Sequence, residues 1–224
     1  DPEMSRGLGD VYKRQPLRET LAAALVTLSR YRGKDPFCDP FCGSGTIPIE
    51  AALIAKNLAP GLDRSFAAQK WKNMDSKLWL EAGDEAMDKE FHGHYDIWGG
   101  DIDPAAVELA RHNAELAGVE DCIRFEVADA GKFHRDNEYG QLVTNPPYGE
   151  RLLEKKEAED LYRMFGAALR DLPPKWRVLV LSSHTEFERC FGRPADKKRK
   201  LYNGMIKCCL LYTSPSPRDI SGSR

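Results

Sequence analysis

The amino-acid sequence predicts an α/β fold in which a mostly parallel, doubly wound sheet ends in a C-terminal antiparallel hairpin. From residue 96 onward, short apolar segments of strand character alternate with segments of helical period, an order that gives parallel strands joined by crossover helices. Near the C-terminus, Asn203-Gly204 separates two strand-like segments, and this dipeptide accepts positive φ at both central positions of a hairpin turn. The composition, 42% apolar and 30% charged among 224 residues, is that of one globular domain.

The first elements form a helix, a strand, a glycine turn and a second helix. Leu17 to Tyr31 has apolar residues at helical spacing, and Gly33 is expected to end this helix. Phe37 to Phe41 is a short apolar segment typical of a buried strand. Helical periodicity resumes from Ile47 to Leu58, with Thr46 as the expected cap.

The rest of the chain continues the alternation after an insert of weaker pattern. Residues 59–95 have many charges and no sustained period, and we expect a helical insert there. The later elements are expected, in order, as strand Ile97 to Gly100, helix Pro104 to Ala117, strand Ile123 to Val127, strand Leu142 to Thr144, helix Ala158 to Leu172, strand Val178 to Ser182, a short helix near Glu186, and hairpin strands Lys197 to Tyr202 and Met205 to Cys208.

The two ends of the chain are expected to lie outside the fold. Codons can be chosen for Cys209 to Asp219 so that the reverse complement of that DNA, read one base later, encodes Ser5 to Arg14. An inverted pair of this kind is typical of a sequencing adapter translated at both edges of an assembled fragment. The sequence therefore predicts one domain at residues 16–208, between adapter-derived, non-native tails at 1–15 and 209–224.

Composition excludes several classes of protein. No segment has the roughly 18 to 20 uncharged apolar residues of a membrane-spanning helix, and the N-terminus lacks the apolar segment of a secretory signal. The six cysteines do not form the pattern of a disulfide framework, and free thiols are typical of a reducing compartment. We expect a cytoplasmic protein without membrane partners. Acidic residues slightly outnumber basic ones, so a polyanion would need a local basic patch.

The glycine turn after the first strand has the position of a ligand site. Asp39-Pro40-Phe41-Cys42-Gly43-Ser44-Gly45-Thr46 allows a ligand to approach the backbone at a helix N-terminus. The segment lacks the third glycine of a dinucleotide fingerprint and the Gly-Lys pair of a phosphate loop. Asp39 repels phosphate but suits a cation. S-adenosylmethionine, which carries an ammonium and a sulfonium group, is a candidate.

Carboxylates recur at the ends of the next two strands. Asp101 ends one strand and Asp129 follows the next, so three successive strands carry an aspartate at the carboxyl edge of the sheet. Asp101 is placed to accept hydrogen bonds from two ribose hydroxyls, and Asp129 to accept one from an adenine amino group. Either could alone be a turn residue, but their common order favours a cofactor site. Asp103, just before Pro104, is better interpreted as a helix N-cap.

The tetrapeptide Asn145-Pro146-Pro147-Tyr148 after the strand Leu142 to Thr144 carries the most specific signal. A residue before proline is held extended, so Asn145 directs its amide beyond the strand. The Asn145 side-chain oxygen and the Pro146 carbonyl can both accept from one exocyclic NH2 group, and Tyr148 offers a flat face for a base. When two acceptors bind the two hydrogens of a conjugated amine, they favour the form in which the lone pair is localised on the nitrogen. Methyl transfer from S-adenosylmethionine then needs alignment, with no metal or covalent nucleophile, and a base stacked on Tyr148 has left its helix.

At these residues the sequence resembles the catalytic domain of bacterial guanine-N2 methyltransferases of 23S ribosomal RNA, of the THUMP-associated, NPPY type. The resemblance covers residues 16–208 and implies a Rossmann-like, class I S-adenosylmethionine-dependent methyltransferase fold. It also implies a large-subunit ribosomal RNA substrate and a THUMP-type RNA-binding domain N-terminal to the catalytic domain. The segments that carry it are DPFCGSGT, PIEAALIA, RSFAAQKW, GDIDP, NPPYGERL and RKLYNGMIKC.

The resemblance implies a set of site residues. In it, Asn145, Pro146, Pro147 and Tyr148 hold the target amine. The residues expected at the cofactor are Asp39, Pro40, Cys42, Gly43, Gly45, Asp101, Ile102, Asp129, Ala130 and Asn145. Because the tetrapeptide also occurs in DNA adenine-N6 and protein glutamine-N5 methyltransferases, those activities, a tRNA guanine-N2 activity and a non-catalytic RNA-binding module remain alternatives.

Two further groups have both a structural and a functional interpretation. Cys38 and Cys42 lie close in sequence, but no second cysteine pair follows, and we expect no metal site. Lys197-Lys198-Arg199-Lys200 is the dense basic segment of the domain. It could be a solvated strand face or a phosphate contact beside the active site, and Arg151 could also face RNA.

Overall fold

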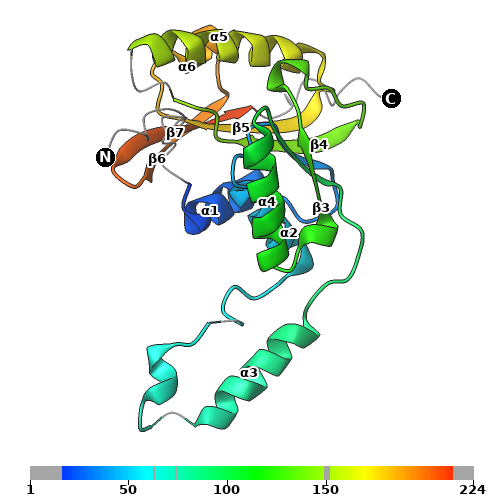
Figure 1. Ribbon diagram of the computed structural model, residues 1–224, viewed down its shortest axis with the longest axis vertical. Helices are drawn as coiled ribbons and strands as arrows, with labels where there is room; N and C mark the ends of the chain where they lie inside the picture. The colour runs from blue at the N-terminus through cyan, green and yellow to red at the C-terminus, as the bar shows by residue number, and fades with distance from the viewer. Residues whose placement is uncertain (1–16, 63, 74, 149–151, 214–224) are drawn as a thin grey trace, which may run out of the picture.

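Helices and strands alternate along the chain in the computed structural model (Figure 1). The structure describes residues 17–62, 64–73, 75–148 and 152–213. Among these, no helix is both long and apolar enough to cross a membrane. The strands are β1 (Phe37–Asp39), β2 (Ile97–Asp101), β3 (Ile123–Val127), β4 (Tyr139–Thr144), β5 (Lys175–Ser182), β6 (Lys197–Asn203) and β7 (Ile206–Thr213). The α-helices are α1 (Glu19–Ser29), α2 (Thr46–Lys56), α3 (Ser76–Asp88), α4 (Pro104–Leu116), α5 (Leu152–Ala168) and α6 (Phe187–Phe191).

All seven strands form one sheet in the order β3-β2-β1-β4-β5-β7-β6. The strands from β1 to β5 pair in parallel, while β7 runs antiparallel to β5 and to β6. The predicted parallel sheet with a closing antiparallel hairpin is therefore confirmed. The predicted turn Asn203-Gly204 is wrong: Asn203 pairs with Ile206 as the last residue of β6, so the turn residues are Gly204 (φ 60°) and Met205.

The two faces of the sheet bury separate apolar cores. Successive residues of a strand point to opposite faces, so Phe37 packs in a first core with α1, α2 and α4, while its neighbour Cys38 packs in a second core with α5 and α6. In β5, Leu179 packs in the first core and its neighbour Val178 packs in the second. Helices therefore cover both faces of the sheet, as a doubly wound fold requires.

Three helices begin or end at residues other than those expected from the sequence. The first helix ends at Ser29, where Arg30 takes the left-handed conformation (φ 63°), and not at Gly33. The N-cap of α2 is Gly45 (φ 82°) rather than Thr46, which is the first helical residue. Helix α5 begins six residues before the expected Ala158, because its strong helix formers extend the helix toward the N-terminus.

The C-terminal strand extends past the expected domain boundary. β7 continues to Thr213, and its residues Cys209 to Thr213 pair with β5 in the register from Ser182 to Val178. This segment therefore takes part in the sheet, whatever its origin. Residues 1–16 and 214–224 lie outside the described residues, and the adapter origin of the two tails stays a prediction.

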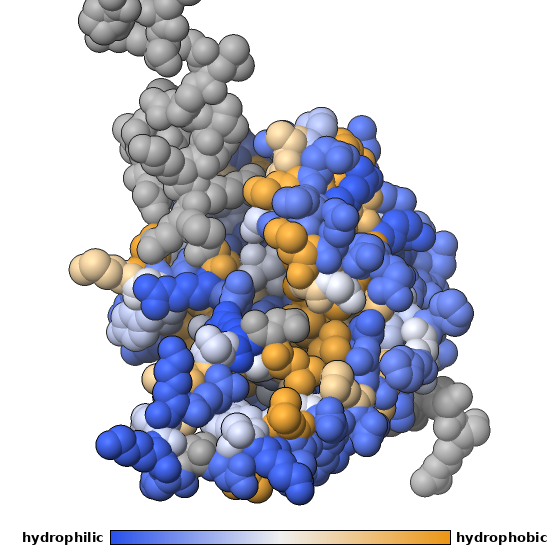
Figure 2. All heavy atoms as spheres, turned by 60° about the horizontal axis from the view of Figure 1, so that its bottom comes forward, coloured by the Kyte–Doolittle hydropathy of each residue, from blue (hydrophilic) through white to orange (hydrophobic). Residues whose placement is uncertain are grey.

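The insert between α2 and β2 extends away from the sheet (Figure 1). It contains a 3-10 helix, Ala67–Lys70, and α3, which begins after the N-cap Asp75. Figure 2, in which this side of the molecule comes forward, shows apolar side chains gathered between hydrophilic ones. The large apolar side chains exposed on the insert are Phe66, Trp71, Leu78, Leu80, Met87 and Phe91.

Candidate active site

The site expected from the sequence lies where β1 and β4 meet at the carboxyl edge of the sheet. From β1 the chain passes through α2 to β2 on one side, whereas β4 pairs with the other side of β1. Such a reversal of strand order opens a crevice at the carboxyl ends, where α/β sheets bind ligands. The structure brings Asp39, Asp101, Asp129 and Asn145 to the ends of four adjacent strands along this edge.

Two backbone N–H groups of the glycine turn after β1 donate hydrogen bonds to β2. The Cys42 N–H donates to the Gly100 carbonyl at 2.9 Å, and the Gly43 N–H donates to Asp101 Oδ2 at 3.0 Å. Gly45 needs to be glycine for two reasons: its φ is 82°, and a Cβ there would lie 2.9 Å from the Cβ of Ala110 in α4. The turn is thus held close to α4.

Asp39 joins β1 to β4 at the point where the strand order reverses. Its side chain is 1% exposed, and its Oδ1 accepts the Thr144 hydroxyl at 2.5 Å and the Phe41 N–H at 3.1 Å. Since Thr144 directly precedes Asn145, this hydrogen bond connects the glycine turn to the start of the tetrapeptide. The carboxylate expected at the methionine end of a cofactor therefore also fixes the position of the amine-binding motif.

The carboxylates after β2 and β3 each hold local backbone. Asp101 is 2% exposed, and its Oδ2 and Oδ1 accept the N–H groups of Gly43 and of Asp103. Asp103 accepts the Ala105 N–H as the N-cap of α4, as expected from the sequence. Asp129 accepts the Gly131 N–H through Oδ1, and its side chain is 39% exposed.

The tetrapeptide after β4 is tied together by two tyrosine hydroxyls. Tyr148 Oη donates to Asn145 Oδ1 at 2.5 Å, and Cys208 Sγ in β7 donates to Tyr148 Oη at 3.6 Å. Burial raises the pKa of Tyr148 well above its ordinary value, so this hydroxyl keeps its proton. Asn145 itself is partly buried and Pro146 is buried.

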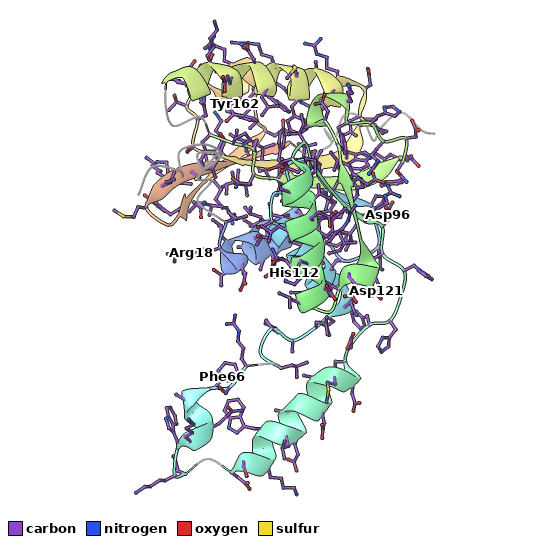
Figure 3. The ribbon with its side chains drawn as sticks, viewed as in Figure 1. Arg18, Phe66, Asp96, His112, Asp121 and Tyr162 are labelled. Carbon is purple, nitrogen blue, oxygen red and sulfur yellow. The ribbon has the colours of Figure 1, made fainter. Side chains whose placement is uncertain are left out.

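A second tyrosine supports the motif from α5. Tyr162, labelled in Figure 3 on the side of α5 that faces the sheet, is fully buried and donates from Oη to the Pro147 carbonyl at 2.5 Å. Burial raises the pKa of Tyr162 to about 12. The ring packs against Phe187 of α6, with 4.7 Å between ring centroids. The position of the Pro147 carbonyl therefore depends on the packing of two helices.

The remaining expected residues lie beside these groups. Pro40, Cys42 and Ala130 are buried next to the strand ends, whereas Ile102 is 68% exposed. Sequence reasoning missed Thr144, Tyr162 and Asn113, whose Nδ2 donates to the Ser44 carbonyl at 2.9 Å. A polar Thr144 at the end of an apolar strand was a usable signal, but the partners of the other two are set by the fold.

The structure also places the cysteines and the basic segment that the sequence singled out. Within the described residues, no group of three or more His, Cys, Asp or Glu side chains is placed to hold a metal ion, and none of the six cysteines forms a disulfide. In the basic segment of β6, all four cationic residues are exposed, and Lys198 pairs with Glu188. Arg151 lies outside the described residues.

Residues 6–212 match the model of the RMKL-like methyltransferase domain family. The chain belongs to this family. Its fold is therefore the Rossmann-like methyltransferase fold predicted above. Curated relatives include YpsC of Bacillus subtilis (strain 168), named as a candidate RNA methyltransferase, which is 47% identical over 86% of this chain and 50% of the relative. The ribosomal RNA large subunit methyltransferase K/L of Shewanella baltica (strain OS195) is 40% identical over 93% of the chain.

The RMKL-like domain spans only part of these relatives, about half of YpsC and about 30% of methyltransferase K/L. Solved structures agree with the fold. A candidate methylase from Clostridium difficile 630 superposes with a TM-score of 0.86 at 45% identity, covering 89% of this chain and 53% of that one. SMU.472, described as a candidate methyltransferase complexed with SAH, gives a TM-score of 0.86 at 41% identity, covering 90% and 53%.

Proposed function

We propose that this chain transfers a methyl group from S-adenosylmethionine to the exocyclic N2 amine of a guanine in large-subunit ribosomal RNA. The observation that carries the proposal is the continuous connection Asp39–Thr144–Asn145, which joins the glycine turn to an amide oxygen at the carboxyl edge of the sheet. Family membership and the names of the K/L relatives support methyl transfer to ribosomal RNA.

The residues along the edge fit the proposed cofactor. Asp39, Asp101 and Asp129 provide carboxylates at three adjacent strand ends, suited to an ammonium group, ribose hydroxyls and an adenine amino group. The glycine turn has no lysine for phosphate. Pro40, Cys42, Gly43, Gly45, Ile102 and Ala130 would complete the lining. When bound, S-adenosylmethionine supplies an electrophilic methyl group on its sulfonium.

The tetrapeptide prepares the amine. In this mechanism Asn145 Oδ1 and the Pro146 carbonyl accept the two hydrogens of the target NH2 group, which localises the nitrogen lone pair that is otherwise delocalised into the base. Tyr162, through the Pro147 carbonyl, fixes the backbone that presents these acceptors. The ring of Tyr148 forms one wall for the flipped base.

The test is methyl transfer to unmodified 23S ribosomal RNA transcribed in vitro, followed by nucleoside analysis of the product. Wild-type protein should form N2-methylguanosine. Asn145→Ala should reduce the rate by about 100-fold or more, because it removes one of two acceptors. Asn137→Ala, the same substitution on an exposed loop, is the matched control.

A second candidate is transfer to the N6 amine of adenine in DNA. It is favoured by a solved Listeria monocytogenes str. 4b F2365 protein described as a predicted N6-adenine-specific DNA methylase, 44% identical with a TM-score of 0.83 and covering 89% of this chain. N6-methyladenine in duplex DNA, with no N2-methylguanosine in RNA, would replace the guanine assignment by this one. Unchanged product formation by Asn145→Ala would contradict the role given to Asn145.

A further inference from the structure

Positive charge gathers on the hairpin formed by β6 and β7. Residues 197–207 include five cationic side chains and no Asp or Glu, in a chain whose net charge is −2. Lys198 pairs with Glu188 of α6. Lys200 and Lys207 are exposed, and within the part of the chain that the structure describes neither of them forms an ion pair. Such a surface attracts a polyanion.

The hairpin projects past the sheet edge at which the tetrapeptide lies. β5 ends at Ser182, opposite Cys209 of β7, so residues 201–208 of the hairpin extend beyond β5. β4 runs parallel to β5, and the tetrapeptide follows β4 at this same edge. In the projecting part, Cys208 Sγ donates to Tyr148 Oη at 3.6 Å. The end of the hairpin therefore lies beside the proposed amine site.

An exposed aromatic side chain lies among these cations. Tyr202 is opposite Lys207 in the hairpin, and Lys200 precedes Tyr202 by two residues, so the three side chains share one face. The Tyr202 side chain is 63% exposed. An aromatic ring between two ammonium groups suits a nucleotide, because the base stacks on the ring while the phosphates meet the cations.

Tyr202 also lines a groove between the hairpin and α1, which lie next to each other in Figure 1. The groove has a volume of about 520 Å³, within the range of small-molecule sites. Its lining includes Leu21 of α1 and Met205 at the hairpin turn, whose side chain is 97% exposed. Arg18, labelled in Figure 3, is an exposed cation of the same lining. The groove thus offers apolar surface to a base and a cation to a phosphate.

We propose that the β6–β7 hairpin and this groove bind an unpaired nucleotide of the RNA next to the target guanine, with its base stacked on Tyr202 and its phosphates at Lys200 and Lys207. The inference rests on the function proposed above and names the form of substrate that the site takes. A base stacked on Tyr202 is outside a helix, so this surface selects single-stranded RNA over a duplex. The contact with Tyr148 favours RNA over an anionic lipid surface, which would attract the same lysines.

The test is equilibrium binding of the full chain to a fluorescently labelled single-stranded RNA of about ten nucleotides, measured by anisotropy at several salt concentrations. Tyr202→Ala should weaken binding about tenfold without changing its salt dependence, because the stacked ring has no charge. Tyr202→Phe keeps the ring and should bind within about twofold of the wild type. Tyr139→Ala, at the exposed start of β4 on the opposite edge of the sheet, should bind as the wild type does.

Salt dependence distinguishes the lysines. For a single strand, the slope of log K against log salt concentration is about −0.7 for each neutralised phosphate. Lys200→Gln and Lys207→Gln should therefore each reduce the size of the slope by about 0.7. Lys198→Gln is the matched control, since Lys198 is already paired with Glu188, and it should reduce the slope by less than half as much. Equal reductions for all three lysines, or no loss of affinity in Tyr202→Ala, would overturn the proposal.

Two other ligands complete the test. At equal salt concentration, the wild type should bind the single strand more tightly than a duplex of the same sequence, and Tyr202→Ala should lose most of this preference. Vesicles of phosphatidylcholine and phosphatidylserine represent the lipid surface. Binding to these vesicles without binding to the RNA, or no RNA binding by the folded wild type, would overturn the proposal.

The outcomes also separate this inference from the proposed function. Formation of N2-methylguanosine, with equal RNA affinity of the wild type and Tyr202→Ala, overturns the inference alone. RNA binding that depends on Tyr202, without methyl transfer to guanine, overturns the proposed function and leaves the nucleotide surface standing.

Discussion

At the scale of single residues, the Thr144 hydroxyl connects the two halves of the site. It is fully buried and donates to Asp39 Oδ1, so Thr144→Val leaves a buried carboxylate with one donor fewer. We expect the free energy of unfolding to fall by about 1–3 kcal/mol, measured by urea denaturation. Thr27→Val provides the control, since the Thr27 hydroxyl bonds only its own helix at an exposed position, and its effect should stay within about 0.5 kcal/mol. Equal effects of the two substitutions would argue against the buried link.

Glu50 in α2 makes stability depend on pH. Burial, with a smaller contribution from the nearby charge of Glu19, raises the pKa of Glu50 to about 7 from an ordinary 4.5. Between these two values the folded state binds more protons than the unfolded state, so stability is present below pH 4.5 and is lost as the pH rises through 7. Because the side chain is partly exposed, the loss should be about 1–2 kcal/mol between pH 5 and 8.

Glu50→Gln tests this dependence. The neutral amide has no proton to lose, so the variant should be less sensitive to pH over this range and more stable than the wild type at pH 8. Urea denaturation at pH 5, 6, 7 and 8 measures both effects. A wild-type stability that increases from pH 5 to 8 through this residue would have the opposite sign to the one expected.

At the scale of elements, the packing of α5 on α6 supports the tetrapeptide through Tyr162. Gly166 in α5 lies against α6, where an added Cβ would be 2.0 Å from the Phe191 carbonyl oxygen. Gly166→Ala must therefore separate the two helices, and we expect a loss of about 1–3 kcal/mol or more in unfolding free energy. Gly83→Ala in α3 is the matched control, because its added Cβ meets nothing within 4 Å. It should be neutral or stabilising by up to about 1 kcal/mol. A destabilisation of equal size at both positions would contradict this account.

The order of the elements could be predicted from sequence because it depends on local periodicity, whereas their ends could not. The glycine stop expected at Gly33 was replaced by Arg30 in the left-handed conformation, which an arginine rarely adopts and no local rule anticipates. Asp103 was correctly interpreted as an N-cap because an N-cap bonds within its own helix. Thr144 and Asn113 were missed because their partners lie 105 and 69 residues away.

At the scale of the whole molecule, one sheet edge carries both expected groups, a carboxylate series on β1 to β3 and an amide motif after β4. Their adjacency follows from the strand order, in which β4 pairs with β1 although more than 100 residues separate the bonded Asp39 and Thr144. Sequence reasoning supplied the residues of each group. The topology supplied their proximity.

Calorimetric titration of the full chain with S-adenosylmethionine tests the central claim most directly, that this edge is a cofactor site. The account predicts binding of one molecule per chain and a roughly tenfold or greater loss of affinity for Asp101→Asn, which replaces one of two ribose acceptors by a donor. Asp88→Asn, the same substitution at an exposed position of α3, should bind as the wild type does. Absence of binding by a folded chain, or equal affinity of the wild type and Asp101→Asn, would contradict the account.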